Sequence, residues 1–146
     1  MRATLRRANA TPGSAAAIVR SFIGQVDRGD VAECAVLMHP DIRYCDAKGG
    51  TLVGWSDCME LVRGVAYRLS RKSVEILALA NWGNRVKLRL RTGAADERFN
   101  GLACWTVRVE HGLVRDIEVR REDGLETIRI LVPDLYEREA GAISGR

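Results

Sequence analysis

The sequence predicts an α+β fold in one domain, with helices first and an antiparallel sheet after them. Apolar residues of the first half recur at the three- and four-residue spacing of amphipathic helices. After about Ser73 they alternate with polar residues, as in strands with one buried face. The turns between these later segments are too short for crossover helices, so consecutive strands must run antiparallel.

The first half reads as helix, helix, short hairpin, helix. Ser14 can cap a helix over residues 14–28 that ends at Gly29, after an N-terminal arm of residues 1–13 that we expect to be flexible. A second helix, from about residue 31 to residue 38, should stop before Pro40, because the residue that precedes a proline avoids the helical conformation.

A strand then runs from Ile42 to Asp46 and reverses at Gly49 and Gly50 into a short return strand. The third helix follows the return strand and carries apolar residues from Cys58 to Leu69 at helical spacing.

Four strands make up the second half, and short turns separate them: Val74–Ala80, Val86–Thr92, Phe99–Val109 and Leu113–Arg120. The first of these is apolar on both faces apart from Glu75, so it should be covered on two sides. We therefore expect a homodimer through the outer face of the sheet. Residues 123–146 form a C-terminal extension that can add an edge strand before a loose tail.

Length and charge exclude several classes of protein. The chain has 146 residues, 47% of them hydrophobic, which suits one core and is thin for two. Its 23 basic and 19 acidic residues are spread along the chain and leave a net charge of +4, so we expect no nucleic-acid partner. No apolar run approaches the roughly 20 residues of a membrane-spanning helix, so we expect no membrane partner either.

Cysteine and histidine patterns argue against a metal site. The chain has four dispersed cysteines without a Cys-x-x-Cys pair: Cys34, Cys45, Cys58 and Cys104. This usage is typical of reduced thiols, and we expect a cytoplasmic protein. His39 and His111 lack a suitably spaced cysteine or second histidine, so we expect no metal and no cofactor. We expect His39 to help finish the second helix and His111 to be solvated in a turn.

Three stretches resemble the nuclear transport factor 2-like superfamily: Val26-Asp27-Arg28-Gly29-Asp30, the first strand from His39 to Asp46, and Glu110-His111-Gly112-Leu113-Val114. Its ketosteroid isomerase and SnoaL-type polyketide cyclase branches are closest in pattern, and the resemblance covers about residues 14–122. It implies a cone-shaped α+β barrel whose three N-terminal helices pack in the concave face of a strongly curved, mostly antiparallel sheet. It also implies an apolar pocket for a small hydrophobic molecule at the open end of the cone.

The resemblance places Asp46 where ketosteroid isomerases carry their general base, at the end of the first strand. Alternation along that strand puts Ile42, Tyr44 and Asp46 on one face. In a pocket, Asp46 can take a proton from the carbon next to a carbonyl group, and Tyr44 can donate a hydrogen bond to a bound oxygen. The alternatives are equally ordinary: Asp46 accepts backbone N–H bonds in the turn at 47–49, and Tyr44 packs in the core.

Other pocket candidates have similar alternatives. Trp55 and Trp105 can form an aromatic wall or serve as large core residues, and we expect Val107 to line the pocket beside Trp105. Asp116 follows Val114 by two residues and points inward if Val114 does, or else pairs with an arginine on a neighbouring strand.

The same resemblance puts Phe22 at the position of the tyrosine that binds the oxyanion in ketosteroid isomerases. Trp105, or Cys104 after a one-residue gap, takes the position of their second donor, an aspartic acid. Both donors are then missing, and we expect no efficient steroid isomerase. Two functions remain: an isomerase, cyclase or dehydratase with Asp46 as base, or a non-catalytic ligand-binding or dimerisation module of the same fold.

Overall fold

The structure, a computed structural model, describes residues 14–46, 50–122, 131–132 and 135. The N-terminal arm, the turn at 47–49 and most of the C-terminal extension lie outside the described residues. Within the described part, no helix is both long and apolar enough to cross a membrane.

The first helix, α1 (Ala15–Arg28), forms as its end signals predict. The Ser14 side chain accepts a hydrogen bond from the amide of Ala17, which satisfies one of the amides left over at a helix start. At the other end Gly29 takes the left-handed conformation, with φ 73°, that glycine adopts without a steric cost. The third helix, α3, spans Trp55–Arg68.

The second helix, α2 (Val31–Val36), is shorter than predicted, and its last residue is 67% exposed. Asp30 caps its start, accepting from the amide of Glu33. It ends early because the carbonyl of Leu37 accepts a hydrogen bond from Val114, and Met38 already pairs with that residue in the sheet. Strand pairing with a distant segment therefore overrides the local helical pattern.

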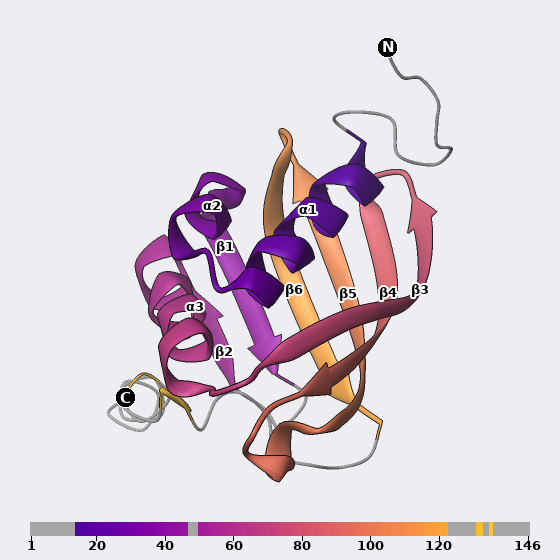
Figure 1. Cartoon of the computed structure of the whole chain (residues 1–146). Helices are drawn as coiled ribbons and strands as arrows, with labels where there is room; N and C mark the ends of the chain where they lie inside the picture. Colours follow the sequence, from indigo (N-terminus) through magenta and orange to yellow (C-terminus); the bar gives the residue numbers. More distant parts are fainter. Residues whose placement is uncertain (1–13, 47–49, 123–130, 133–134, 136–146) are drawn as a thin grey trace.

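Six strands form one curved sheet in the order β2-β1-β6-β5-β4-β3 (Figure 1). Their bounds are β1 Met38–Asp46, β2 Thr51–Val53, β3 Ser73–Trp82, β4 Arg85–Gly93, β5 Gly101–Glu110 and β6 Leu113–Arg121. All neighbours pair antiparallel except β1 and β6, which run parallel. Because β2 and β3 are the two edges, the sheet stays open and does not close into a barrel. Phe99, predicted as a strand residue, ends a short 3-10 turn, Glu97–Phe99, which Asp96 caps.

The helices lie in the concave face of this sheet, and the core fills the space between them (Figure 1). Fully buried side chains come from both layers, among them Val19 and Ile23 of α1 and Val86, Leu88 and Leu90 of β4. The register shifts between Ile76 and Ala78, and such bulges bend the strands they interrupt. The three-helix, curved-sheet α+β arrangement predicted from the sequence is confirmed.

The described part of the C-terminal extension packs on α3. Leu131 and Val132 are buried, and their atoms lie within 3.5 Å of the position that a side chain at Gly64 would occupy. The Arg68 guanidinium donates to the carbonyl of Leu131 from the same helix. The extension therefore covers α3 at these residues.

Candidate functional site

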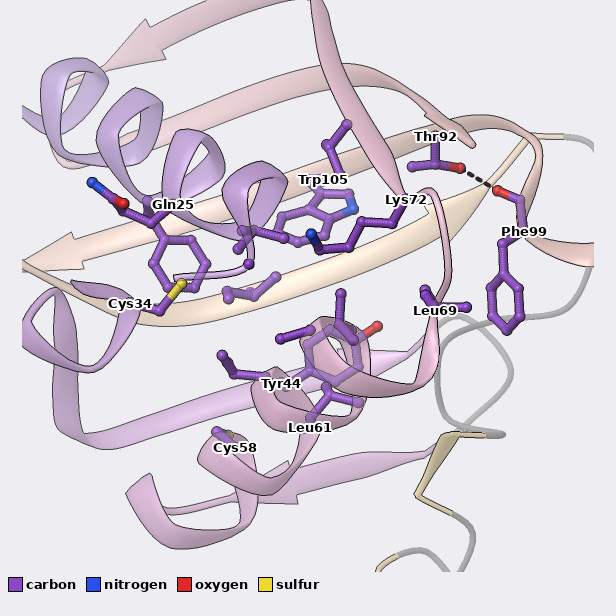
Figure 2. A pocket seen from close by; sticks show the side chains of 18 of the residues that line it. Gln25, Cys34, Tyr44, Cys58, Leu61, Leu69, Lys72, Thr92, Phe99 and Trp105 are labelled. Atoms are coloured by element: carbon purple, nitrogen blue, oxygen red, sulfur yellow. Dashed lines mark hydrogen bonds between the residues drawn. The ribbon is translucent and has the colours of Figure 1, made fainter. Parts of the chain in front are cut away.

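An apolar cavity lies between α1, α3 and the concave face of the sheet (Figure 2). Its enclosed volume is about 100 Å³, and the whole hollow, with the solvent at its mouth, is about 920 Å³. An engineered cavity of about 150 Å³ holds benzene in another protein, so the closed part suits roughly one small ring or a short chain. A larger molecule would extend through the mouth.

Aromatic side chains from four different elements line the cavity: Phe22 of α1, Tyr44 of β1, Phe99 of the 3-10 turn and Trp105 of β5. Figure 2 shows the rings of Tyr44 and Trp105 on different strands, facing the same enclosed space. Of the sequence-predicted residues, the structure thus brings together Phe22, Tyr44 and Trp105.

Asp46 lies on the face predicted for it but is not one of the residues that line the cavity. It is 3% exposed, and the burial of Ile42, Tyr44 and Asp46 alternates with more exposed residues, as the strand period requires. Its amide donates to the carbonyl of Gly50 at 2.7 Å, which closes the β1–β2 hairpin. The carboxylate sits beyond the cavity, one inward position past Tyr44.

Trp55 and Val107, which were also predicted to line the pocket, lie outside the cavity lining. Trp55 begins α3, is 39% exposed and is not part of the cavity lining. Val107 is 1% exposed and packs in the core opposite Ile117, also outside the lining.

Asp116 does not share the inward face with Val114. A register shift between Arg108 and Val109 inserts an extra residue in β6, so Val114 and Ile117 are the buried residues instead. The Asp116 carboxylate accepts a hydrogen bond from the Arg108 guanidinium at 2.7 Å and lies 3.8 Å from that of Arg115. The inward placement was wrong, and the pairing with a neighbouring arginine is what the structure contains.

The polar part of the cavity lining was missed by the sequence interpretation. It includes Lys72, Thr92 and Arg121. Arg121 donates to the Thr92 hydroxyl at 2.9 Å, and that hydroxyl donates to the carbonyl of Phe99 at 2.6 Å. A signal existed for Arg121, because alternation along β6 puts it on the same face as the buried Ile117 and Val119. Lys72 lies in the connection before β3, where no period places it.

Two buried thiols contribute no nucleophile. Burial raises the pKa of Cys34 to about 11, with the nearby Asp30 carboxylate adding to the rise, and burial raises the pKa of Cys58 to about 12. Both lie in the cavity lining and stay protonated at neutral pH. All four cysteines are free in the part of the chain that the structure describes.

A cluster of His39, Glu110 and His111 brings possible metal ligands together, which the sequence interpretation missed. His39 belongs to β1 and does not finish α2 as predicted. Its Nδ1 accepts a hydrogen bond from the amide of Asp41 at 2.9 Å, so a neutral ring carries its proton on Nε2, which lies 3.3 Å from Glu110. Arg115 lies 3.2 Å from the same carboxylate. A protonated Nε2 and a neighbouring guanidinium suit an ion-pair network better than a cation site.

Comparisons with known proteins agree with this architecture. A model of the SnoaL-like domain matches residues 19–117. A comparison with curated protein sequences found no match.

Several solved structures share the fold. A candidate ketosteroid isomerase from Kribbella flavida is similar with a TM-score of 0.68 and 17% identity over 77% of this chain and 81% of that one. An LEH-like epoxide hydrolase from M. tuberculosis has a TM-score of 0.67 and 14% identity over 92% of this chain and 100% of that one. A candidate polyketide cyclase from Sinorhizobium meliloti has a TM-score of 0.64 and 13% identity over 71% of this chain and 94% of that one.

Identities this low establish a common fold, but they do not show that this chain shares the chemistry of any of these proteins. The family model, by contrast, spans more than half of the chain and matches the helices and sheet that enclose the cavity. The chain belongs to the SnoaL-like domain family.

Proposed function

We propose that this protein binds a small, largely apolar molecule in the cavity between its helices and the concave face of its sheet. The observation that carries the proposal is the composition of the wall, in which aliphatic and aromatic side chains surround a few convergent polar groups. Ligand sites in proteins are typically concave, mostly apolar and oriented by a small number of polar groups.

Occupancy of the cavity can be tested with propylbenzene and the indole N–H signal of Trp105 in an NMR titration. We expect propylbenzene to shift this signal in the natural protein. Ala66→Phe places a ring into the cavity from α3 and should abolish the shift, whereas the exposed Ala32→Phe of α2 should not. A signal that stays unshifted in the natural protein, or that shifts equally in both variants, would contradict the proposal.

A second candidate is proton transfer at a carbonyl compound, as in an isomerase, cyclase or dehydratase, with Asp46 as general base. What favours it is a buried carboxylate at the end of β1, on the same face as Tyr44 and beside the cavity. A base must come within hydrogen-bond reach of the proton that it abstracts, so the candidate requires a ligand whose carbon acid extends past Tyr44 toward Asp46. Binding alone, with a structural Asp46, remains the alternative.

Exchange of α-protons for deuterium in a panel of small ketones tests this step without a known substrate. We expect the natural protein to accelerate exchange and Asp46→Asn to lose the acceleration by orders of magnitude, with little change in thermal stability. Full exchange in the variant would exclude Asp46 as base. A large loss of stability would instead show that Asp46 acts through the hairpin turn.

Steroid isomerisation is not part of this proposal. Phe22 and Trp105 line the cavity, and neither supplies the hydroxyl or carboxyl donor that ketosteroid isomerases direct at the oxyanion. Loss of one such donor costs roughly 10²–10³ in rate in other enzymes. We expect negligible conversion of a β,γ-unsaturated 3-ketosteroid, measured by absorbance beside Phe22→Tyr. Turnover comparable to that of a dedicated isomerase would contradict the assignment of Phe22 and Trp105 to the two donor positions.

We also propose a homodimer through the outer face of the sheet and a cytoplasmic location, the latter supported by the free thiols. Ala78, Ala80 and Trp82 of β3 are exposed, and Trp82 is 61% exposed. Light scattering at micromolar concentration should give a dimer mass that Ala80→Glu reduces. Tyr67→Glu, on the exposed side of α3, should leave it unchanged. A monomer mass for the natural protein would exclude the dimer.

A further inference from the structure

A second hollow lies at the end of the sheet where β3 begins, β4 ends and β5 begins. It is open to solvent and has a volume of about 570 Å³, which is in the range of small-molecule sites. Arg91 and Leu102, paired across β4 and β5, line it and lie on the outer face, because Leu90 and Thr92 face the core and the cavity. The hollow therefore opens toward the outer face, although three residues of β3 and β4 form part of both walls.

The polar side chains of this hollow offer hydrogen-bond donors. Among the described residues that line it, Arg71 and Arg91 are charged, and none is Asp or Glu. The Oδ1 atom of Asn100 accepts a hydrogen bond from the amide of Ala94 at 2.8 Å, so the Nδ2 group of Asn100 keeps its N–H donors for another partner. The lining therefore suits a negatively charged acceptor.

A glycine keeps the space between these donors open. A side chain at Gly93 would begin 3.0 Å from the Ser73 hydroxyl and 3.6 Å from the Oδ1 atom of Asn100. Such a side chain would occupy the space between the two residues. With glycine there, the exposed Ser73 hydroxyl is a further donor in the hollow.

Nearby carboxylates leave the two arginines of the hollow available. Arg91 lies 3.4 Å from Glu75, but both side chains are more than half exposed, and pairs of this kind are weak. Arg71 is exposed and forms no ion pair with another described residue. Glu97 is exposed and does not line the hollow. Other carboxylates near this end of the sheet pair with other arginines: Asp96 with Arg98, and Glu122 with Arg89.

The backbone of Arg71 has the left-handed conformation, with φ 55°. Glycine adopts this conformation freely and asparagine tolerates it, whereas a long side chain makes it costly. Strained residues of this kind cluster at binding sites, where the function of the side chain offsets the cost. The conformation of Arg71 therefore agrees with a binding role for its guanidinium.

We propose that this hollow binds the oxyanion group of a small polar molecule, a phosphate monoester or a carboxylate. Arg71 and Arg91 supply the positive charge, and the Asn100 amide and the Ser73 hydroxyl donate to the oxygens of the group. The fork of donors on a guanidinium matches both kinds of oxyanion. The site does not depend on what the apolar cavity binds, and it lies at the other end of β3 from Trp82.

An NMR titration with glycerol 3-phosphate, glycerate and glycerol tests the proposal, read from the backbone amide signals of Gly93 and Gly101. We expect at least one of the two anions to shift these signals, whereas neutral glycerol does not. Tighter binding of glycerol 3-phosphate assigns the group as a phosphate, and tighter binding of glycerate assigns it as a carboxylate. The absence of a shift with both anions, or an equal shift with glycerol, would overturn the proposal.

Two variants with matched controls locate the site. Asn100→Asp keeps the acceptor for the Ala94 amide but replaces the donor with a negative charge, so it should abolish anion binding. Asn84→Asp adds the same charge in the β3–β4 turn and should leave binding unchanged. Arg71→Asn should raise the dissociation constant at least about threefold, as the loss of one exposed ion pair allows, without lowering the Tm. Arg85→Gln, at the far end of β4, should have no effect.

Undiminished anion binding in both Asn100→Asp and Arg71→Asn would overturn the site, as would an equal loss of binding in the two controls. If Asn100→Asp does not fold, Arg71→Asn still decides the question, because it changes an exposed residue in a turn whose backbone asparagine tolerates.

Discussion

Two leucine-to-alanine substitutions should differ in cost because only one of the side chains faces the cavity. Leu61 of α3 is 4% exposed and lines the cavity, whereas Leu88 of β4 is 1% exposed and lies outside the lining. Both are buried by the usual measure, so the amount of exposed surface does not separate them. The difference lies in their neighbours. Part of the Leu61 side chain borders the empty cavity, whereas the Leu88 side chain does not border it.

The expected costs follow from transfer and cavity terms. Removing three carbon groups loses about 2.4 kcal/mol of transfer free energy, at about 0.8 kcal/mol for each group. A residual cavity of roughly 60 Å³ adds about 1.4 kcal/mol at about 24 cal/mol per Å³, which brings the cost of Leu88→Ala to about 4 kcal/mol. At Leu61 fewer contacts exist to be lost, and we expect a cost of about 2.5 kcal/mol.

Urea denaturation followed by tryptophan fluorescence measures both costs, and the chain contains three tryptophans for the signal. The comparison requires equal m-values in the two variants. A loss of stability at Leu61 equal to or larger than that at Leu88 would refute the reasoning, because it would mean that the space beside Leu61 is filled in solution.

Three further predictions concern single contacts. The Asp27 carboxylate accepts a hydrogen bond from β3 at 2.8 Å, so Asp27→Ala should lower the free energy of unfolding by about 1 kcal/mol in urea denaturation, since the pair is exposed; an unchanged midpoint would exclude a structural role for this bond. Asp116→Ala breaks a half-buried pair with Arg108 and should destabilise the protein by about 1–2 kcal/mol while propylbenzene affinity stays the same; lost affinity with intact stability would restore Asp116 as a ligand-binding residue. Because burial raises the pKa of Cys34 to about 11 and that of Cys58 to about 12, the thiolate is only a small fraction of each group at neutral and mildly alkaline pH. Both thiols should therefore resist alkylation from neutral pH to mildly alkaline pH until the chain unfolds, as peptide mapping after iodoacetamide treatment would show.

Local geometry explains which features could be predicted from sequence. The caps at Ser14 and Gly29 act within one helical turn, and their residues suffice to predict where α1 begins and ends. Strand alternation likewise depends only on neighbours in the chain, so the inward face of Tyr44 and the buried positions of β4 follow from the pattern alone.

Long-range pairing decided the rest. The premature end of α2 comes from Leu37 and Met38 pairing with Val114, which lies far along the chain. The Asp116 side chain points away from the inward face because of a bulge in the pairing of β5 and β6, and the residues of β6 alone do not predict this bulge. The polar part of the cavity wall needs β3, β4 and β6 to come together before Lys72, Thr92 and Arg121 can line one cavity. A period of two or of 3.6 residues specifies a face of one element, whereas a site depends on the register between elements, and that register is set by how the whole sheet packs against its helices.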